Sequence, residues 1–112
     1  MTATLIDARP AAVNLALYAG DDFWLDIAVT DPAGDPADLT GQTARSDIRS
    51  RADMPVVASF TATIAGNVIH LYLAGADVAG LPQAAVWDCQ LADADTVTLA
   101  AGNVRTWPQV TV

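Results

Sequence analysis

The sequence has no lysine, no glutamate, one cysteine and one histidine. A single cysteine forms neither an intrachain disulfide nor a paired-cysteine zinc site, so both of those small-domain classes are excluded. Basic residues are also scarce, because five arginines stand against 13 aspartates and give a net charge of -8. Nucleic acid and anionic membranes both require a positive face on the protein. We therefore expect neither of them as the main partner.

Long apolar runs are missing as well. No stretch approaches the roughly 18 consecutive apolar residues of a membrane-spanning helix. Residues 1–10 lack the charged head and apolar run that are typical of a secretory signal. We expect a soluble protein made in a cytoplasm, and its 112 residues are enough for one domain.

Apolar residues are plentiful, at 53% of the chain, but 23 of them are alanines, which fit almost any structure. The pattern is therefore more informative than the composition, and it has a period of two. In the segment 23–30, the residues Phe23, Leu25, Ile27 and Val29 share one face, while Asp26 and Thr30 lie on the other. A helix would scatter the four apolar residues around its circumference, so this segment is predicted to be a strand.

The same alternation predicts further strands at 13–18, 43–50, 57–64, 68–73, 85–91, 96–100 and 104–112. Turns are expected at 65–67 and at Gly102–Asn103, and a short helical turn over 75–82 is expected to cross from one sheet to the other. Pro108 should confine the last strand to an edge or a bulge. Together these elements predict an all-β antiparallel β-sandwich of seven to eight strands. Residues 1–12 should form a loosely held N-terminal arm, and residues 13–112 the sandwich domain.

Few residues could carry chemistry. His70 lies on the polar face of its strand, and nothing in the local sequence brings a nucleophile and a carboxylate to it. We predict no enzyme and no catalytic, cofactor-binding or metal-binding residues. A calcium ion, if one were bound, would be expected first at Asp31, Asp35 and Asp38, although aspartates in loops are also explained by their capping of backbone donors.

Candidate interface residues fall into two groups. Arg45, Arg49 and Arg51 hold three of the five positive charges within seven residues. They could dock on an acidic partner, or form a solvated face that is balanced by nearby aspartates. Trp24 and Tyr72 are predicted to be outward-facing aromatics, and His70 a solvent-facing or interface residue.

The order of the segments carries a resemblance. Tyr18–Asp22 precedes an alternating strand, Asp31–Gly41 forms a loop, an arginine-bearing strand and a hairpin follow, and the chain ends with Ala85–Leu91 and Gly102–Val112. In this order and spacing, residues 15–112 resemble the immunoglobulin-like amino-terminal domain of tailed-phage baseplate upper proteins and related phage minor structural proteins. The resemblance implies an immunoglobulin-like sandwich. Larger members of that family continue into a receptor-binding or fibre-carrying region where this sequence stops, so a separate adaptor or accessory subunit is expected.

The expected function is that of a non-enzymatic structural protein of a tailed-phage virion, placed as a tail or baseplate accessory. Capsid decoration or a head-fibre base is the alternative placement. The expected partners are other virion proteins in a symmetric multi-copy assembly, and the chain should reside in the host cytoplasm before assembly. A hypothesis of another class is a carbohydrate-binding module in which Trp24, Tyr72 or Trp107 stacks against sugar rings.

Overall fold

The computed structural model describes residues 2–5, 11–30, 33–92 and 96–108. In these ranges the chain forms nine strands and one short helix. Their bounds are β1 (Thr2–Leu5), β2 (Ala11–Ala12), β3 (Leu15–Tyr18), β4 (Phe23–Val29), β5 (Thr43–Arg49), β6 (Val56–Ala65), β7 (Val68–Leu73), α1 (Gly75–Ala79), β8 (Ala84–Ala92) and β9 (Thr96–Trp107).

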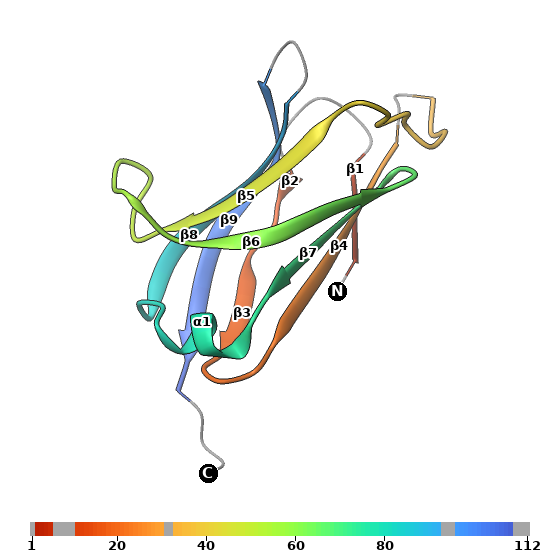
Figure 1. Ribbon diagram of the computed structural model, residues 1–112. Coiled ribbons are helices and arrows are strands. Elements are labelled where there is room, and N and C mark those ends of the chain that lie inside the picture. The colour runs from red at the N-terminus through yellow and green to blue at the C-terminus, as the bar shows by residue number, and fades with distance from the viewer. Residues whose placement is uncertain (1, 6–10, 31–32, 93–95, 109–112) are drawn as a thin grey trace.

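The strands form two layers that share β6 (Figure 1). The first half of β6 pairs with β5, and its second half pairs with β7. One layer is therefore β1-β4-β7-β6, and the other is β6-β5-β8-β9 with β2 and β3 beside β9. The pairs from β4 onward are antiparallel, whereas β1, β2 and β3 pair in parallel with their neighbours. The predicted all-β sandwich is confirmed.

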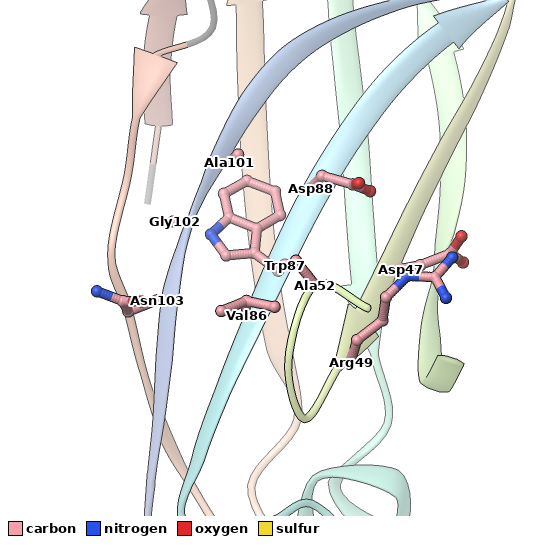
Figure 2. A pocket seen from close by; sticks show the side chains of 9 residues that line it. All are labelled: Asp47, Arg49, Ala52, Val86, Trp87, Asp88, Ala101, Gly102 and Asn103. Atoms are coloured by element: carbon pink, nitrogen blue, oxygen red, sulfur yellow. The ribbon is translucent and has the colours of Figure 1, made fainter. Parts of the chain in front are cut away.

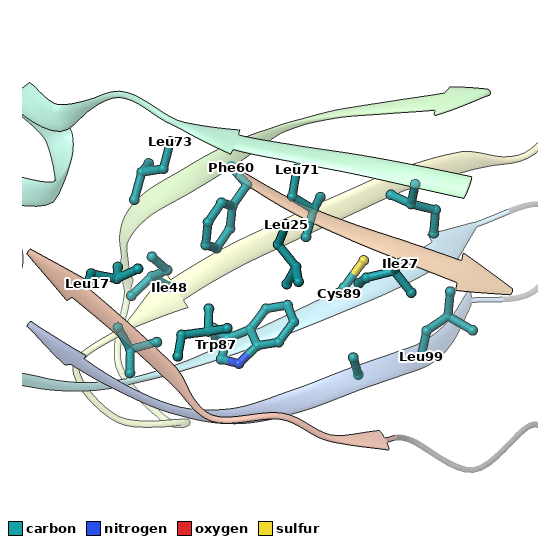
Figure 3. Close-up of a cluster of buried hydrophobic side chains, with 14 of the residues drawn as sticks. Leu17, Leu25, Ile27, Ile48, Phe60, Leu71, Leu73, Trp87, Cys89 and Leu99 are labelled. Atoms are coloured by element: carbon teal, nitrogen blue, oxygen red, sulfur yellow. The ribbon is translucent and has the colours of Figure 1, made fainter. Parts of the chain in front are cut away.

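The alternating apolar residues meet between the layers (Figure 3). Leu25, Ile27 and Leu71 come from one layer, Ile48 and Cys89 come from the other, and all are almost fully buried. Each large apolar side chain that is buried in this way contributes about 1.5–3 kcal/mol to folding. The predicted inward faces are therefore confirmed, because the period-two pattern follows directly from a strand with one face in the core.

The predicted helical turn between the sheets is also confirmed. Helix α1 carries the chain from β7 in one layer to β8 in the other. Its first residue, Gly75, packs so closely on the turn before β4 that a Cβ atom would lie 2.3 Å from the carbonyl oxygen of Gly20. The Gly75 amide donates a hydrogen bond to Oδ1 of Asp22 at 2.7 Å. This contact fixes the crossover against the β3–β4 turn.

The turn expected at Gly102–Asn103 is wrong, because β9 runs without a break from Thr96 to Trp107. Gly102 serves a different purpose. The backbone of Val13, between β2 and β3, runs beside the strand there, and a Cβ atom on Gly102 would lie 2.0 Å from the carbonyl oxygen of Val13. A glycine inside a strand commonly marks such a close approach of another backbone. The strand ends at Trp107, directly before Pro108, which has no amide hydrogen to donate.

Parts of the expected N-terminal arm are paired with the body of the domain. Residues Thr2–Leu5 form β1 beside β4, and Ala11–Ala12 form β2 beside β9. Main-chain pairing of this kind is a tighter attachment than a loosely held arm, because it satisfies backbone donors and acceptors along the strand. The division of the chain at residue 12 itself stays a prediction.

Cys89 provides a chemical test of this core. Its side chain is fully buried, and burial, followed by the nearby charge of Asp88, raises the pKa of the thiol from 9.0 to about 12. We expect the folded protein to leave the thiol unreacted with a disulfide reagent at pH 8, and one thiol per chain to react in denaturant. Because the folded pKa is the higher one, stability should fall as the pH rises from 9 towards 12. Rapid reaction of the native protein would contradict the buried placement.

Candidate interaction surfaces

The predicted interface residues lie on two opposite outer faces of the sandwich. Trp24, His70 and Tyr72 project from β4 and β7, on what we call the β4–β7 face. Arg45 and Arg49 project from β5, on the outer side of the other layer, which we call the β5–β9 face. The sequence could not separate these groups, since it does not show which strands share a layer.

The β4–β7 face carries two cross-strand pairs. Trp24 lies opposite Tyr72 with ring centroids 5.3 Å apart, and 60% of the Trp24 residue surface is exposed. Asp26 lies opposite His70, with Oδ1 2.6 Å from Nδ1. Desolvation and the charge of Asp22 raise the pKa of the Tyr72 hydroxyl. This face therefore presents a pair of accessible rings beside polar groups, as the outward-facing prediction requires.

The arginines of β5 are engaged by their own layer. Arg45 Nε lies 2.7 Å from Oδ2 of Asp47, whose other carboxylate oxygen accepts a 2.6 Å hydrogen bond from Oγ of Ser59. Arg49 Nη1 donates to the carbonyl oxygen of Met54 at 2.8 Å and so holds the loop between β5 and β6. Arg51 is exposed within this loop. The balanced arrangement with Asp47 is present, and a docking role for these arginines stays a prediction.

A hollow of about 310 Å³ opens on the β5–β9 face (Figure 2). Its lining consists of Asp47, Arg49, Ala52, Val86, Trp87, Asp88, Ala101, Gly102 and Asn103. Asp47 and Asp88 are direct cross-strand partners, and two like charges so placed disfavour each other. Partial burial, followed by the charge of Asp47, raises the pKa of Asp88. This pair could not be predicted from the sequence, because it depends on the register between β5 and β8.

The same face ends in an aromatic and cationic patch formed by Tyr18, Arg105 and Trp107. The two rings belong to directly paired residues of β3 and β9, and both residues are exposed, at 54% and 42%. The guanidinium of Arg105 lies over the Trp107 ring, 4.7 Å from its centroid. Tyrosine, tryptophan and arginine are the residues that most often dominate binding at protein interfaces. Tyr18 and Arg105 were not among the predicted interface residues, because they come together only through the parallel β3–β9 pairing.

The described residues contain no cluster of three or more side chains suited to a metal ion. Asp31 lies outside the described residues, so the calcium set cannot be placed as a whole. Asp38 accepts a hydrogen bond from the amide of Thr40 at 3.0 Å, and hydrogen bonds from the Thr40 side chain and backbone lower its pKa. This is the capping role expected of a loop aspartate. In the part of the chain that the structure describes, no helix has the length and apolar character needed to cross a membrane.

Comparison with known proteins shows the fold. No protein-family model matches the chain, and no curated protein matches it in sequence. Among solved structures, the N-terminal domain of phage TP901-1 ORF48 superimposes with a TM-score of 0.60 and 10% identity, over 95% of this chain and 98% of that one.

Immunoglobulin domains give similar matches. A structure of the titin M10–obscurin-like 1 Ig complex matches with a TM-score of 0.54 and 15% identity, over 91% of this chain and 93% of that one. The titin M3 domain matches with a TM-score of 0.51 and 9% identity, over 86% and 91%. The chain therefore has an immunoglobulin-like β-sandwich fold, which it shares with a phage domain.

Proposed function

We propose that this chain is a non-enzymatic structural protein of a tailed-phage virion. The observation that carries the proposal is the match to the phage TP901-1 ORF48 N-terminal domain, which covers nearly the full length of both chains. The sequence resemblance to the amino-terminal domains of baseplate upper proteins points the same way. A tail or baseplate accessory is the preferred placement, with capsid decoration or a head-fibre base as the alternative.

The proposed mechanism is adhesion through preformed surfaces. Both outer faces of the sandwich present exposed aromatic residues, Trp24 on one and Tyr18 and Trp107 on the other. A rigid sheet loses little conformational entropy when it docks, so such residues can contribute most of their contact energy to binding. Repetition of the subunit around a symmetric particle would multiply weak contacts into firm attachment.

Carbohydrate binding is the second candidate function, and one observation favours it. The rings of Trp24 and Tyr72 lie side by side on an open sheet face, with the Asp26–His70 pair next to them. Accessible rings offer a stacking surface to a sugar, and the neighbouring polar groups offer hydrogen-bond partners. Such a site would lie on the β4–β7 face and would leave the β5–β9 face free.

The two functions are separated by one set of measurements. We expect the chain to co-purify with density-banded phage particles in a fixed copy number, measured by quantitative mass spectrometry. Trp24→Ala should reduce its incorporation if the β4–β7 face docks on a virion protein, with Thr63→Ala on the same face as the matched control. Absence of the chain from the particles, together with glycan binding that Trp24→Ala abolishes, would overturn the structural role in favour of the carbohydrate-binding one.

A further inference from the structure

The β5–β9 face carries two complementary charged places, and neither is neutralised by an ion pair. Within the described residues the ion pairs are Arg45–Asp47 and His70–Asp26. Arg105, stacked on Trp107, and Asp88, in the hollow, belong to neither of them. The face therefore presents the Arg105 cation at one place and, at another, a hollow whose charged lining residues are Asp47, Asp88 and Arg49. Asp47 is paired with Arg45, so in the part of the chain that the structure describes Asp88 is the carboxylate of the hollow that is left without an ion pair.

The spacing of these two places is symmetric about Asn103. Residues on one side of a strand recur every second position, so Ala101, Asn103, Arg105 and Trp107 share the outer side of β9. Arg105 lies two residues beyond Asn103 and Ala101 two residues before it. Asp88 is the cross-strand partner of Ala101, and Val86 is the partner of Asn103. The cation and the acid thus stand at matching distances on either side of the Asn103–Val86 pair.

Consider a two-fold axis that is parallel to the sheet, perpendicular to its strands, and passes above Asn103 and Val86. This axis would bring the cation of one copy to the acid of the other. Such an axis lays β9 of one copy antiparallel across β9 of another. Arg105 of each copy then faces Ala101 of the other, directly beside Asp88. Sheets that pack face to face lie about 10 Å apart, a gap that long side chains from both sides fill.

The hollow is suited to receive the arginine. Its volume of about 310 Å³ corresponds to roughly ten water molecules. The small side chains of Ala52 and Ala101 leave this space open, while Asp88 supplies the carboxylate. Arginine suits such a site because its planar guanidinium can bind a carboxylate through two parallel hydrogen bonds.

We propose that the β5–β9 face docks on the same face of a second copy of this chain, with Arg105 of each copy entering the hollow at Asp88 of the other. A second copy is the occupant that matches both charged places at once, because a two-fold interface brings every residue pair together twice. The reciprocal pairing also offsets the repulsion between two chains that each carry a charge of -8. The inference rests on the proposed function for its multi-copy setting, and it deepens that function by naming a first contact.

Charge exchange tests the pairing. We expect sedimentation equilibrium of the full chain to show a concentration-dependent dimer. Arg105→Asp and Asp88→Arg should each weaken it about 30-fold or more, as expected for breaking a desolvated charge pair. The double variant, Arg105→Asp with Asp88→Arg, should restore the affinity to within a few-fold. Asp77→Arg, an exposed charge change on α1, serves as the control and should leave the dimer unchanged.

Cross-linking tests the axis without changing either charge. Asn103→Cys should be joined into a covalent dimer by a short bismaleimide, because the two positions meet at the axis and Cys89 is buried. Thr63→Cys, on the opposite face, should stay uncross-linked. A chain that is monomeric at high concentration, a double variant that stays monomeric, or equal cross-linking at both positions would overturn the inference. A monomeric chain that still enters particles would overturn the dimer and leave the proposed function standing. A dimer that is absent from particles would support the dimer and overturn the proposed function.

Discussion

Replacing Trp87 with alanine should lower the free energy of unfolding by about 3–5 kcal/mol, the usual cost of removing a large aromatic side chain from a core. Trp87 is 3% exposed and packs edge-on against Phe60, with ring centroids 6.1 Å apart. Its indole Nε1 donates a 2.7 Å hydrogen bond to the carbonyl oxygen of Val13. The side chain therefore both fills the core and holds the segment that leads into β3.

Trp87→Phe separates these two roles. It keeps an aromatic ring in the core but leaves the Val13 carbonyl without its donor, which should cost about 1–3 kcal/mol. Urea denaturation followed by circular dichroism measures both variants. Trp24→Ala is the matched control, since that tryptophan is 60% exposed and its replacement should change stability by about 0.5 kcal/mol or less. A Trp87→Phe variant as stable as the wild type would contradict the anchoring role.

Gly102→Ala should be destabilising by about 2–4 kcal/mol, although it adds only a methyl group. The added Cβ atom would lie 2.0 Å from the Val13 carbonyl oxygen and 2.7 Å from its carbonyl carbon. The Val13–Asn14 segment would have to move. Two hydrogen bonds to it would then be lost: the one from the Trp87 indole to the Val13 carbonyl oxygen and the one from the Asn103 amide to Oδ1 of Asn14.

The control for this change is Gly80→Ala, where the nearest atom would be 3.6 Å away, an ordinary contact. Its effect on the unfolding midpoint in urea should be small. Because Gly102→Ala and Trp87→Phe disturb the same hydrogen bond, their combined cost should be less than the sum of the two. Additive costs, or a neutral Gly102→Ala variant, would show that the Val13 carbonyl does not pack against Gly102 in this way.

The architecture was predictable because one side of most strands is buried. In β4, β7 and β8 apolar residues occupy every second position, so that both the strands and their inward residues could be predicted. Gly102 shows where such reasoning fails. A glycine that begins a turn and a glycine that allows another backbone to approach closely look the same in sequence. The backbone that approaches here belongs to Val13, far away in the chain.

The candidate surfaces were predictable only where they are local. Arg45 and Asp47 are two residues apart on one strand, so their shared face followed from the period of two. The opposition of Asp47 and Asp88 depends on the β5–β8 register, and the meeting of Tyr18 with Trp107 depends on parallel pairing across most of the chain. Side-chain spacing within one strand carries no information on either.

Because β6 belongs to both layers, the two layers of the sandwich are joined by main-chain pairing along one side. Along that side, the layers cannot separate without breaking the main-chain hydrogen bonds from β6 to β5 or β7. On the opposite side, β1 and β4 belong to one layer and β2 and β3 to the other, and no main-chain pairing of the described strands joins the two layers there. Side-chain packing and the short turn between β3 and β4 hold this side together. Local separation of the two layers should therefore begin at β3 and β4, and amide hydrogen exchange should be faster in these strands than in β6.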